Sequence, residues 1–422
     1  MKLQTAQNVV EKNGRFAETP YTLKSSAKSF FLLSNGLYSH KERAVIRELS
    51  TNAYDSHVEN GNADQSFDVH LPTYAEPNFY VRDYGTGMSL ESCTHYNTTF
   101  FESNRVDSNE AIGCMGLGCK SPLAYADSFI TESYYNGKVY IFNSYRDENG
   151  MPQFALVDEK DTTEPNGIKV SITVNNYDIE KFRIEAEYVY RHFKVKPNFV
   201  GRQLNIPTDN VIISGSNWTF SHNSGSNIVV MGQVAYPLET HAIEESVRKF
   251  IEYSSGLTLF VNIGDVDITP SRESLSYTKQ TKANLTAIIQ TVINEVETRL
   301  KEEITSQKSL FKARLKYTEL SNRCSSIKNI TSRISKNIEW NGVKLFDSTG
   351  TETISVPKFS GIKAMQKRYR KGIQYNECEN ISFDRSRTVY MIDDLNRGGV
   401  GRLRKFFKDH EYPDGVCVYF YS

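Results

Sequence analysis

Apolar residues recur every three or four positions across residues 28–60, and this spacing predicts helix through the whole stretch. Within it, Glu48, Asn52 and Asp55 are four and three residues apart, so a helix stacks their side chains in one row. An apolar stripe lies beside that row and consists of Val45, Ile46, Leu49 and Ala53. The polar row therefore borders a packed face, whereas a solvated face is the ordinary expectation for such spacing.

The chain then changes to the period-two pattern of strands. Residues 66–72 and 78–87 predict strands, and residues 127–174 predict a series of hairpins with Asn-Gly turns at 136, 149 and 166. A helical segment followed by mostly antiparallel strands indicates an α+β fold, with helices packed on one face of a mixed sheet.

Further along, the pattern predicts a helix, three strands and a long amphipathic helix, at 180–195, 211–213, 228–236, 257–263 and 282–304. The last part of the chain reads as strand, helix and strand. We therefore predict three domains: an α+β domain over 1–180, an α/β domain over 181–300 and a small α/β domain over 301–422.

Charge is unevenly distributed, because residues 301–422 carry 23 Lys+Arg against 14 Asp+Glu while residues 1–300 carry 27 against 36. A basic C-terminal domain permits a protein, membrane-surface or nucleic-acid partner, and a solvated basic face is the alternative. The six cysteines lack zinc-ligand spacing, the N-terminus lacks the apolar core of a signal peptide, and no run approaches ~18 apolar residues. These features predict a reduced, cytosolic protein.

Two glycine-rich turns could bind a ligand. Asp83 ends the second predicted strand and is followed by Gly85, Gly87 and Met88. A carboxylate there can accept a hydrogen bond from an exocyclic amine, while glycines let the backbone approach a flat ring. An ordinary turn is the alternative for this motif taken alone.

The second turn precedes a short helix expected over LAYAD, residues 123–127. It lacks the Walker spacing, but glycines there free backbone amides to hold phosphate, and a lysine adds positive potential. The residues concerned are Gly113, Gly116, Leu117, Gly118 and Lys120. A structural turn is again the alternative.

Four motifs occur in a fixed order: E-x-x-x-N-x-x-D from 48, D-x-G-x-G from 83, G-x-x-G-x-G from 113 and G-x-x-V from 167. In this order the chain resembles the GHKL ATPases, which include gyrase-type topoisomerases, mismatch-repair ATPases, histidine kinases and the ninety-kilodalton heat-shock chaperones. The tract YSHKERAVIRELSTNAYD is most similar to the chaperones. The resemblance covers roughly residues 20–300.

The resemblance implies an ATPase that uses Mg²⁺. It implies that Glu48 is the general base for the attacking water and that Asn52 holds Mg²⁺ against the phosphates. Asp55 would support the adenine pocket, Asp83 would bind the adenine amine, and the 113–120 loop would close over the phosphates. The chemistry is coherent, because phosphoanhydride hydrolysis needs in-line water and charge neutralisation with little covalent help.

The chain departs from the chaperone pattern at Gly167-Ile168, where those proteins carry Gly-Thr with the threonine in the adenine network. Thr173 is the candidate replacement. The segment LTLFVNIGDVDITPSRESLSYTKQTK resembles the middle or transducer domain of the same ATPases. Arg272 is the first candidate to contact the γ-phosphate, on docking of the second domain, with Lys279 and Lys282 as alternatives.

The segments GLGCKSPLAYADSF and EPNGIKVSITV resemble the rapid-lysis protein A family of tailed bacteriophages. That likeness implies a phage protein in the host-cell cytoplasm or at the periphery of the inner membrane, associated with lysis control and exclusion. The ATPase resemblance also implies a homodimer formed through the N-terminal domain.

Other function classes stay open. A topoisomerase subunit would need a metal-binding cleavage domain, for which the tail offers only the adjacent pair Asp393-Asp394. A histidine kinase would need a histidine in a helix upstream of the ATPase motifs, and His40 lies within the catalytic helix region. A nucleotide-gated effector with little turnover is the third alternative, which an intact Glu48 disfavours.

Overall fold

The structure is a computed structural model that describes residue 21 and residues 26–102, 112, 116–222, 226–252, 254–322, 325–335 and 337–345. Beyond residue 352 it describes the backbone of six strands and a few residues between 401 and 409. Contacts group the chain into two units: residues 1–243 with 256–285, and residues 244–255 with 286–422. The predicted domain boundaries at 180 and 300 stay a prediction.

The first unit is built on a seven-stranded mixed sheet in the order β5-β4-β3-β6-β2-β1-β7. All neighbouring strands pair antiparallel except β1 and β7, which are parallel. The strands are β1 (Asp68–His70), β2 (Asn78–Arg82), β3 (Ser128–Tyr135), β4 (Lys138–Arg146), β5 (Pro152–Asp161), β6 (Gly167–Thr173) and β7 (Asn198–Val200). The predicted hairpins and the α+β class are confirmed.

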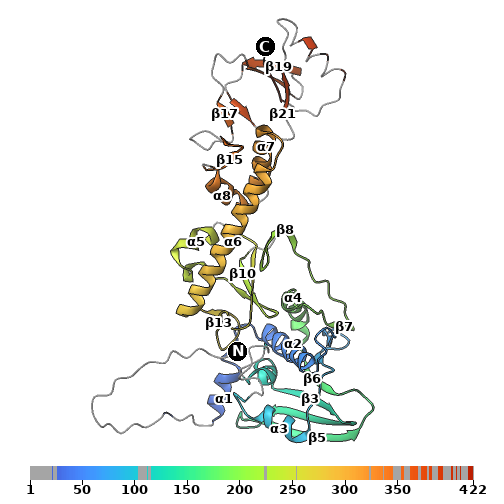
Figure 1. Ribbon diagram of the computed structural model, residues 1–422. Coiled ribbons are helices and arrows are strands. Elements are labelled where there is room, and N and C mark those ends of the chain that lie inside the picture. Colours follow the sequence, from blue (N-terminus) through green and yellow to red (C-terminus); the bar gives the residue numbers. More distant parts are fainter. Residues whose placement is uncertain are drawn as a thin grey trace, which may run out of the picture. The chain divides into compact units, whose positions relative to one another are not determined.

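Helices α2 (Lys41–Glu59) and α4 (Ile179–Tyr190) lie on one face of this sheet (Figure 1). The stripe predicted on α2 is buried there with the inward side chains of the strands and of α4, namely Val45, Ile46, Leu49, Ala53, Phe79, Val81, Val170, Ile172, Ile179, Phe182 and Ala186. Burial of this apolar surface holds the helices on the sheet.

The predicted helix over 28–60 is two helices, because α1 (Ala27–Ser34) ends at Asn35 and α2 begins at Lys41. Ser26 caps α1 by accepting a hydrogen bond from the Ser29 amide. The helix expected over 123–127 is instead a 3₁₀ helix, η1 (Gly118–Ala124), which begins five residues earlier. A third helix, α3 (Leu90–Thr98), follows the first glycine turn.

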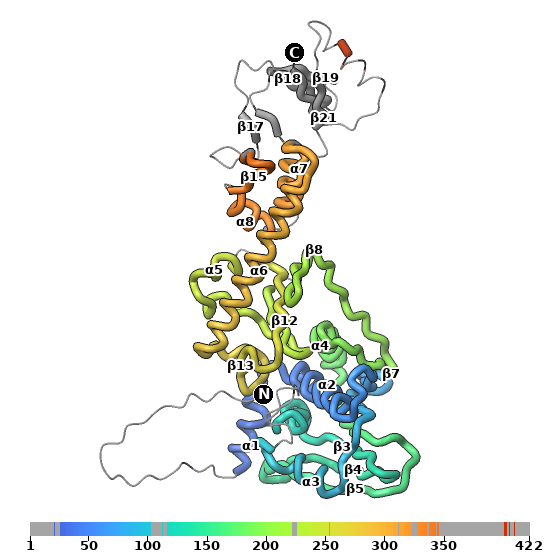
Figure 2. The backbone as a smooth tube through the Cα atoms, viewed as in Figure 1, coloured from blue at the N-terminus to red at the C-terminus, as the bar shows by residue number. Residues whose placement is uncertain are grey.

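A second, five-stranded sheet has the order β11-β10-β12-β9-β8. Its strands are β8 (Asn210–Ser214), β9 (Trp218–His222), β10 (Ile228–Met231), β11 (Val234–Pro237) and β12 (Leu257–Val261). The single strand predicted over 228–236 is therefore the hairpin β10–β11. Figure 2 shows the extended stretch that leads from β7 to β8. The short hairpin β13 (Asp267–Ile268) and β14 (Leu275–Ser276) carries residues 269–274 as its loop.

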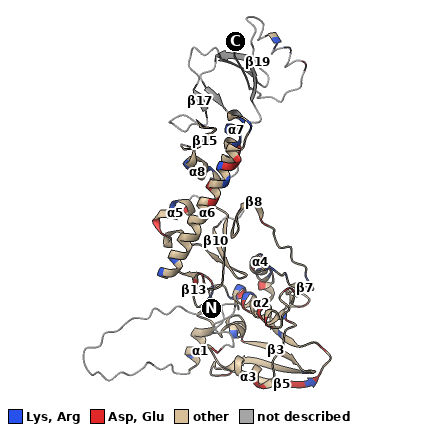
Figure 3. Ribbon diagram, in the orientation of Figure 1, with Lys and Arg blue, Asp and Glu red and all other residues tan. Residues whose placement is uncertain are grey.

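The long predicted helix is confirmed as α6 (Lys279–Thr305). Within the second unit, α7 (Leu310–Ser321) and α8 (Ser325–Ile334) are joined by a hydrogen bond between the hydroxyls of Ser321 and Thr331. Figure 3 shows both charge signs on α6 and α7, where Lys316 pairs with Glu303.

The other elements of this unit are α5 (Glu245–Glu252), β15 (Glu339–Trp340), β16 (Val343–Lys344), β17 (Thr353–Ser355), β18 (Ile362–Arg368), β19 (Gly372–Glu377), β20 (Asn380–Ser382), β21 (Thr388–Ile392) and β22 (Cys417–Tyr421). The parallel pairing of β21 with β22 agrees with the predicted strand–helix–strand tail. Among the described residues, no helix combines the length and apolar character needed to cross a bilayer.

Replacing Phe182 by alanine tests the packing of α4 on the first sheet. The Phe182 ring is fully buried, with its centroid 5.3 Å from that of Phe79 and 5.1 Å from that of Tyr125. Phe182→Ala should lower the free energy of unfolding by about 3–5 kcal/mol in urea titrations. Tyr177→Ala, at a ring 83% exposed, is the control and should change it by less than about 0.5 kcal/mol. Equal effects would contradict this packing.

Candidate functional site

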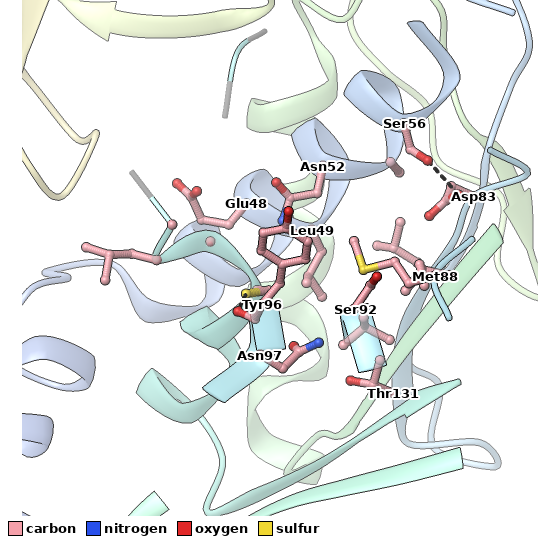
Figure 4. Close-up of a pocket in the computed structure, with 18 of the residues that line it drawn as sticks. Glu48, Leu49, Asn52, Ser56, Asp83, Met88, Ser92, Tyr96, Asn97 and Thr131 are labelled. Atoms are coloured by element: carbon pink, nitrogen blue, oxygen red, sulfur yellow. Dashed lines mark hydrogen bonds between the residues drawn. The ribbon is translucent and has the colours of Figure 1, made fainter. Parts of the chain in front are cut away.

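A cavity of about 460 Å³ opens in the first unit between α2, the first sheet and α3 (Figure 4). It brings together most of the residues that the sequence singled out. Its walls include Glu48, Asn52, Asp83, Gly87, Met88, Gly116, Leu117, Gly118 and Arg272. Apolar side chains between them complete the walls: Leu49, Ala53, Val81, Ile168 and Val170. The cavity is thus apolar in the middle, with polar groups at defined places.

One face of α2 runs along the cavity, and Figure 4 shows Glu48, Asn52 and Ser56 following one another along it. These residues are four apart, so the cavity-facing row continues through Ser56, and Asp55, contrary to the prediction, is not part of it. Asp55 is buried and accepts a hydrogen bond from the Ile112 amide at 3.1 Å. Its carboxylate therefore holds the 112 segment and does not line the cavity.

Glu48 is 3% exposed, and each of its carboxylate oxygens accepts a hydrogen bond from an arginine. Arg47 Nε lies 3.1 Å from Oε1, and Arg272 Nη1 lies 2.8 Å from Oε2. Both guanidiniums are also buried, so the pairing takes place away from water. A buried carboxylate needs such compensation, because an isolated charge in this environment is very costly.

The loop between β13 and β14 carries Arg272 to this point. Arg272 has φ of 56°, a left-handed conformation that is unfavourable for a residue with a Cβ atom. Its neighbours fix the loop to the start of α2: Arg47 Nη2 donates to the Ser271 carbonyl at 2.7 Å, and the Glu273 carboxylate accepts from the His40 amide at 2.8 Å. Arg272 was expected to reach the site only on domain docking, but it already contacts Glu48 here.

Asp83 lies at the far end of α2 from Glu48 and is 5% exposed. Its Oδ1 accepts hydrogen bonds from the Gly85 amide at 2.9 Å and from Ser56 Oγ at 3.1 Å. Oδ2 has no hydrogen-bond partner among the residues that the structure describes. Burial raises the pKa of Asp83 above its usual value, although the hydrogen bond from Gly85 and the charge of Arg82 oppose that rise.

The backbone of the two glycines after Asp83 lies close to neighbouring segments, which leaves little room for a side chain at either position. A Cβ at Gly85 would lie 2.0 Å from Ser56 Oγ and 2.9 Å from the Ser56 carbonyl oxygen, so a side chain there would displace the Ser56 hydroxyl and crowd the backbone of α2. Gly87 has φ of +67°, and a Cβ there would meet the Tyr134 carbonyl at 2.0 Å. Gly85 itself does not line the cavity; it holds Asp83 and Ser56 together.

Gly118 brings the second glycine turn against the cavity, whereas Gly113 lies outside the described residues. Lys120 is buried, and its ammonium donates to the carbonyls of Tyr96, Thr99 and Gly116 at 2.6–2.9 Å. Three acceptors use its three donors, so Lys120 ties α3 to the turn and does not face the cavity.

Three other predicted residues lie away from the cavity. Thr173 is exposed at the end of β6, Lys279 is exposed at the start of α6, and Lys282 is partly buried in the next turn. Sequence reasoning also missed cavity residues, namely Tyr38, Ser56, Ser92, Tyr96, Asn97 and Thr131. Thr131 could have been predicted from the sequence, because it is a polar residue at an inward-facing position of a strand with alternating polarity. Burial raises the pKa of Tyr38, so its hydroxyl stays protonated.

The described residues contain no group of three or more His, Cys, Asp or Glu side chains that could hold a metal. A nucleotide-bound Mg²⁺ needs less, because it takes one or two protein oxygens and completes its shell with phosphate and water. Asn52 supplies a carboxamide oxygen at the cavity wall. A Cβ at Gly118 would lie 3.2 Å from Asn52 Nδ2 and 3.0 Å from Glu48 Oε2, so glycine keeps this corner open. These residues fit a magnesium–nucleotide complex.

No protein-family model and no curated protein matches the chain. Among solved structures, the ATPase region of Saccharomyces cerevisiae topoisomerase II bound to ICRF-187 (dexrazoxane) aligns with 16% sequence identity and a TM-score of 0.41, over 62% of this chain and 85% of that chain. A second structure of the same region gives the same identity and TM-score over 60% and 83%.

The raised pKa of Asp83 predicts how ligand binding depends on pH. An ionised Asp83 accepts a hydrogen bond from a base amine, and protonation removes that acceptor. ATP affinity should therefore fall as the pH drops through a pKa that lies above the usual carboxyl value. Calorimetry from pH 7 downwards checks this, with Asp83→Asn as the comparison.

Asp83→Asn should bind ATP more weakly at pH 7 and should lose this pH dependence. A raised pKa also means that ionised Asp83 opposes folding above that pKa, so the asparagine variant should not melt at a lower temperature at pH 7. An unchanged ATP affinity in Asp83→Asn would show that no base binds at Asp83.

Proposed function

We propose that this protein binds ATP and hydrolyses it, as an ATPase of the GHKL type. One observation carries the proposal: a single cavity holds the buried Asp83, next to Ser56 near the end of α2, together with Asn52 and Glu48, about one and two turns earlier on the same helix. Ser56, which contacts Asp83, is eight residues from Glu48, or about 12 Å along the helix. That distance suits a ligand with a base at one end and phosphates at the other.

The Asp83 end has the character of a base pocket. The middle of the cavity, next to Asp83, is walled by the apolar side chains of Leu49, Ala53, Val81, Ile168 and Val170, which favour a flat apolar ring. Asp83 Oδ1 is used by Gly85 and Ser56, which leaves Oδ2 to accept from an exocyclic amine. Adenine presents such an amine next to an apolar ring face.

The Glu48 end has the groups that phosphate hydrolysis requires. In the structure Arg272 pairs with Glu48 Oε2. A terminal phosphate offers Arg272 a second anionic partner, and once Arg272 moves to it, Oε2 can accept the proton of an attacking water. Arg272 then stabilises the charge that develops on the transferred phosphoryl group. Asn52 would hold Mg²⁺, whose contribution is to neutralise phosphate charge.

A nucleotide-gated effector with little turnover is the second candidate, and the pairing of Glu48 favours it. Both carboxylate oxygens already accept a hydrogen bond from a guanidinium, so a water has to compete with these charged donors for Glu48. If Arg272 stays on Glu48 after ATP binds, the protein would close on nucleotide without hydrolysing it.

Finer assignments rest on the motif resemblance alone and belong to the same proposal. The first is a homodimer formed through the N-terminal domain. The second is a cellular role like that of the chaperones, of the topoisomerase ATPases or of the phage rapid-lysis family. The third is a location in the host-cell cytoplasm or at the inner membrane. The basic region after residue 300 would bind a protein, lipid or nucleic acid. ATP-dependent association in sedimentation experiments would support the dimer, and a monomer at all nucleotide conditions would contradict it.

Replacing Glu48 by glutamine tests the general base. Glutamine removes the negative charge and the base but keeps the shape and one acceptor oxygen, whereas alanine would leave both Arg47 and Arg272 without an acceptor at this position. Glu48→Gln should reduce phosphate release from saturating ATP by about 10²–10⁴-fold, while calorimetry shows retained ATP binding. Glu91→Gln, at an exposed position of α3, is the matched control. Undiminished hydrolysis in Glu48→Gln would exclude Glu48 as the base, whereas ATP binding without hydrolysis by the unsubstituted protein would favour the effector.

Replacing Arg272 by alanine tests its transfer to the phosphate. Arg272→Ala should cut turnover by about 10³-fold, on the scale of arginine fingers, and should leave ADP affinity unchanged because ADP lacks the terminal phosphate. Steady-state phosphate release and ADP calorimetry check the two parts. A comparable loss in Lys279→Ala or Lys282→Ala alone would transfer the role to that lysine.

A further inference from the structure

Thr131 is a buried polar residue that the mechanism above does not use. It lies on β3, it is 2% exposed, and its side chain lines the cavity. Its hydroxyl has no hydrogen-bond partner among the residues that the structure describes. A buried hydroxyl without a partner costs free energy, so folded proteins seldom keep one where nothing else will bond to it.

Two neighbouring hydroxyls are already engaged, that of Ser133 on β3 and that of Ser56 on the cavity wall. Ser133, the next inward residue on β3, donates to the Met88 carbonyl at 2.7 Å and accepts from the Met88 amide at 3.1 Å. Ser56 donates to Asp83. Thr131 differs from both because its hydroxyl has no partner among the described residues, and the residue itself lines the cavity.

Strand register places Thr131 on the base side of the cavity. Thr131 pairs with Val170 of β6, which in turn pairs with Val81 of β2, so the three side chains share one face of the sheet. Asp83 follows Val81 by two residues and continues on that face. Figure 4 shows Thr131 on the same side of the pocket as Met88 and Asp83, with Glu48 on the other side.

The spacing fits a planar ring between Thr131 and Asp83. Two strand spacings separate β3 from β2, which is about 10 Å between backbones, and both side chains extend into the cavity. A base can therefore give its amine to Asp83 at one edge and meet the Thr131 hydroxyl at another, directly or through one bridging water.

We propose that Thr131 is a base-binding residue of this cavity, whose hydroxyl hydrogen-bonds the adenine ring of the nucleotide. The inference rests on the proposed ATP site and deepens it. It gives this chain a threonine for the base where Gly167-Ile168 lacks one and where Thr173 is exposed. A carboxylate only accepts, whereas a hydroxyl can also donate, so Asp83 and Thr131 together read a donor and an acceptor on one base.

The test uses the full chain and two substitutions at one position. Thr131→Val keeps the shape and removes the hydroxyl, and Thr131→Ser keeps the hydroxyl. Calorimetry with ATP and with ADP should show that Thr131→Val loses about 3- to 10-fold in affinity for both nucleotides, the range of one neutral hydrogen bond. Thr131→Ser should stay within about 2-fold. Equal losses for ATP and ADP are expected because both carry the base.

Thermal melting without nucleotide separates a binding role from a structural one. Since Thr131→Val removes an unpartnered buried hydroxyl, its melting temperature should be equal to or above that of the unsubstituted protein. A lower melting temperature together with weaker binding in both variants would overturn the inference, because the residue would then be structural. Unchanged nucleotide affinity in Thr131→Val, or a loss confined to ATP, would also overturn it.

Measuring Asp83→Asn in parallel shows whether a negative result concerns Thr131 alone or the whole proposed ATP site. If Asp83→Asn weakens nucleotide binding and Thr131→Val does not, the site stands and Thr131 is no part of it. If the unsubstituted protein binds neither ATP nor ADP, the proposed function fails and this inference fails with it.

Discussion

The buried carboxylate of Glu48, held between two guanidiniums, is the constraint on which the site depends. Arg47 comes from the same helix, whereas Arg272 comes from a loop 224 residues away. Because neither charge can be left alone in a buried place, the loop and the start of α2 must stay together. The hydrogen bond from Arg47 to the Ser271 carbonyl adds a second tie between the same two segments. Glu48 thus holds the loop that carries Arg272 against α2 at the wall of the cavity.

This arrangement favours function over stability. Buried ion pairs contribute little net stability, since desolvation offsets much of their attraction, and the left-handed backbone of Arg272 adds a further cost. In the proposed mechanism, the arrangement provides an arginine that exchanges Glu48 for a phosphate. Two other groups of the cavity are also buried at a cost in stability. Burial raises the pKa of Asp83, and the hydroxyl of Thr131 has no hydrogen-bond partner among the described residues. Costs of this kind concentrate where a ligand can offset them.

Much of the fold could be predicted from the sequence, because hydrophobic period and turn residues act locally. The hairpins after residue 127, the stripe on α2 and the acid at the end of β2 all follow from spacing. The errors have local causes too. The break at Asn35 interrupts a continuous apolar pattern, and β10 and β11 form a hairpin where the pattern shows one strand. Apolar spacing alone does not mark such breaks.

The sequence by itself determined which side chains share a face: Glu48 and Asn52 on one helix, and Asp83 at a strand end. Only the tertiary structure decided what each face meets. It turned Asp55 towards the 112 segment, and it placed Thr131 in the cavity by pairing β3 with β6. Periodicity fixes the direction of a side chain relative to its own element, whereas contacts between distant elements depend on how whole faces pack, and that packing is a property of the complete fold.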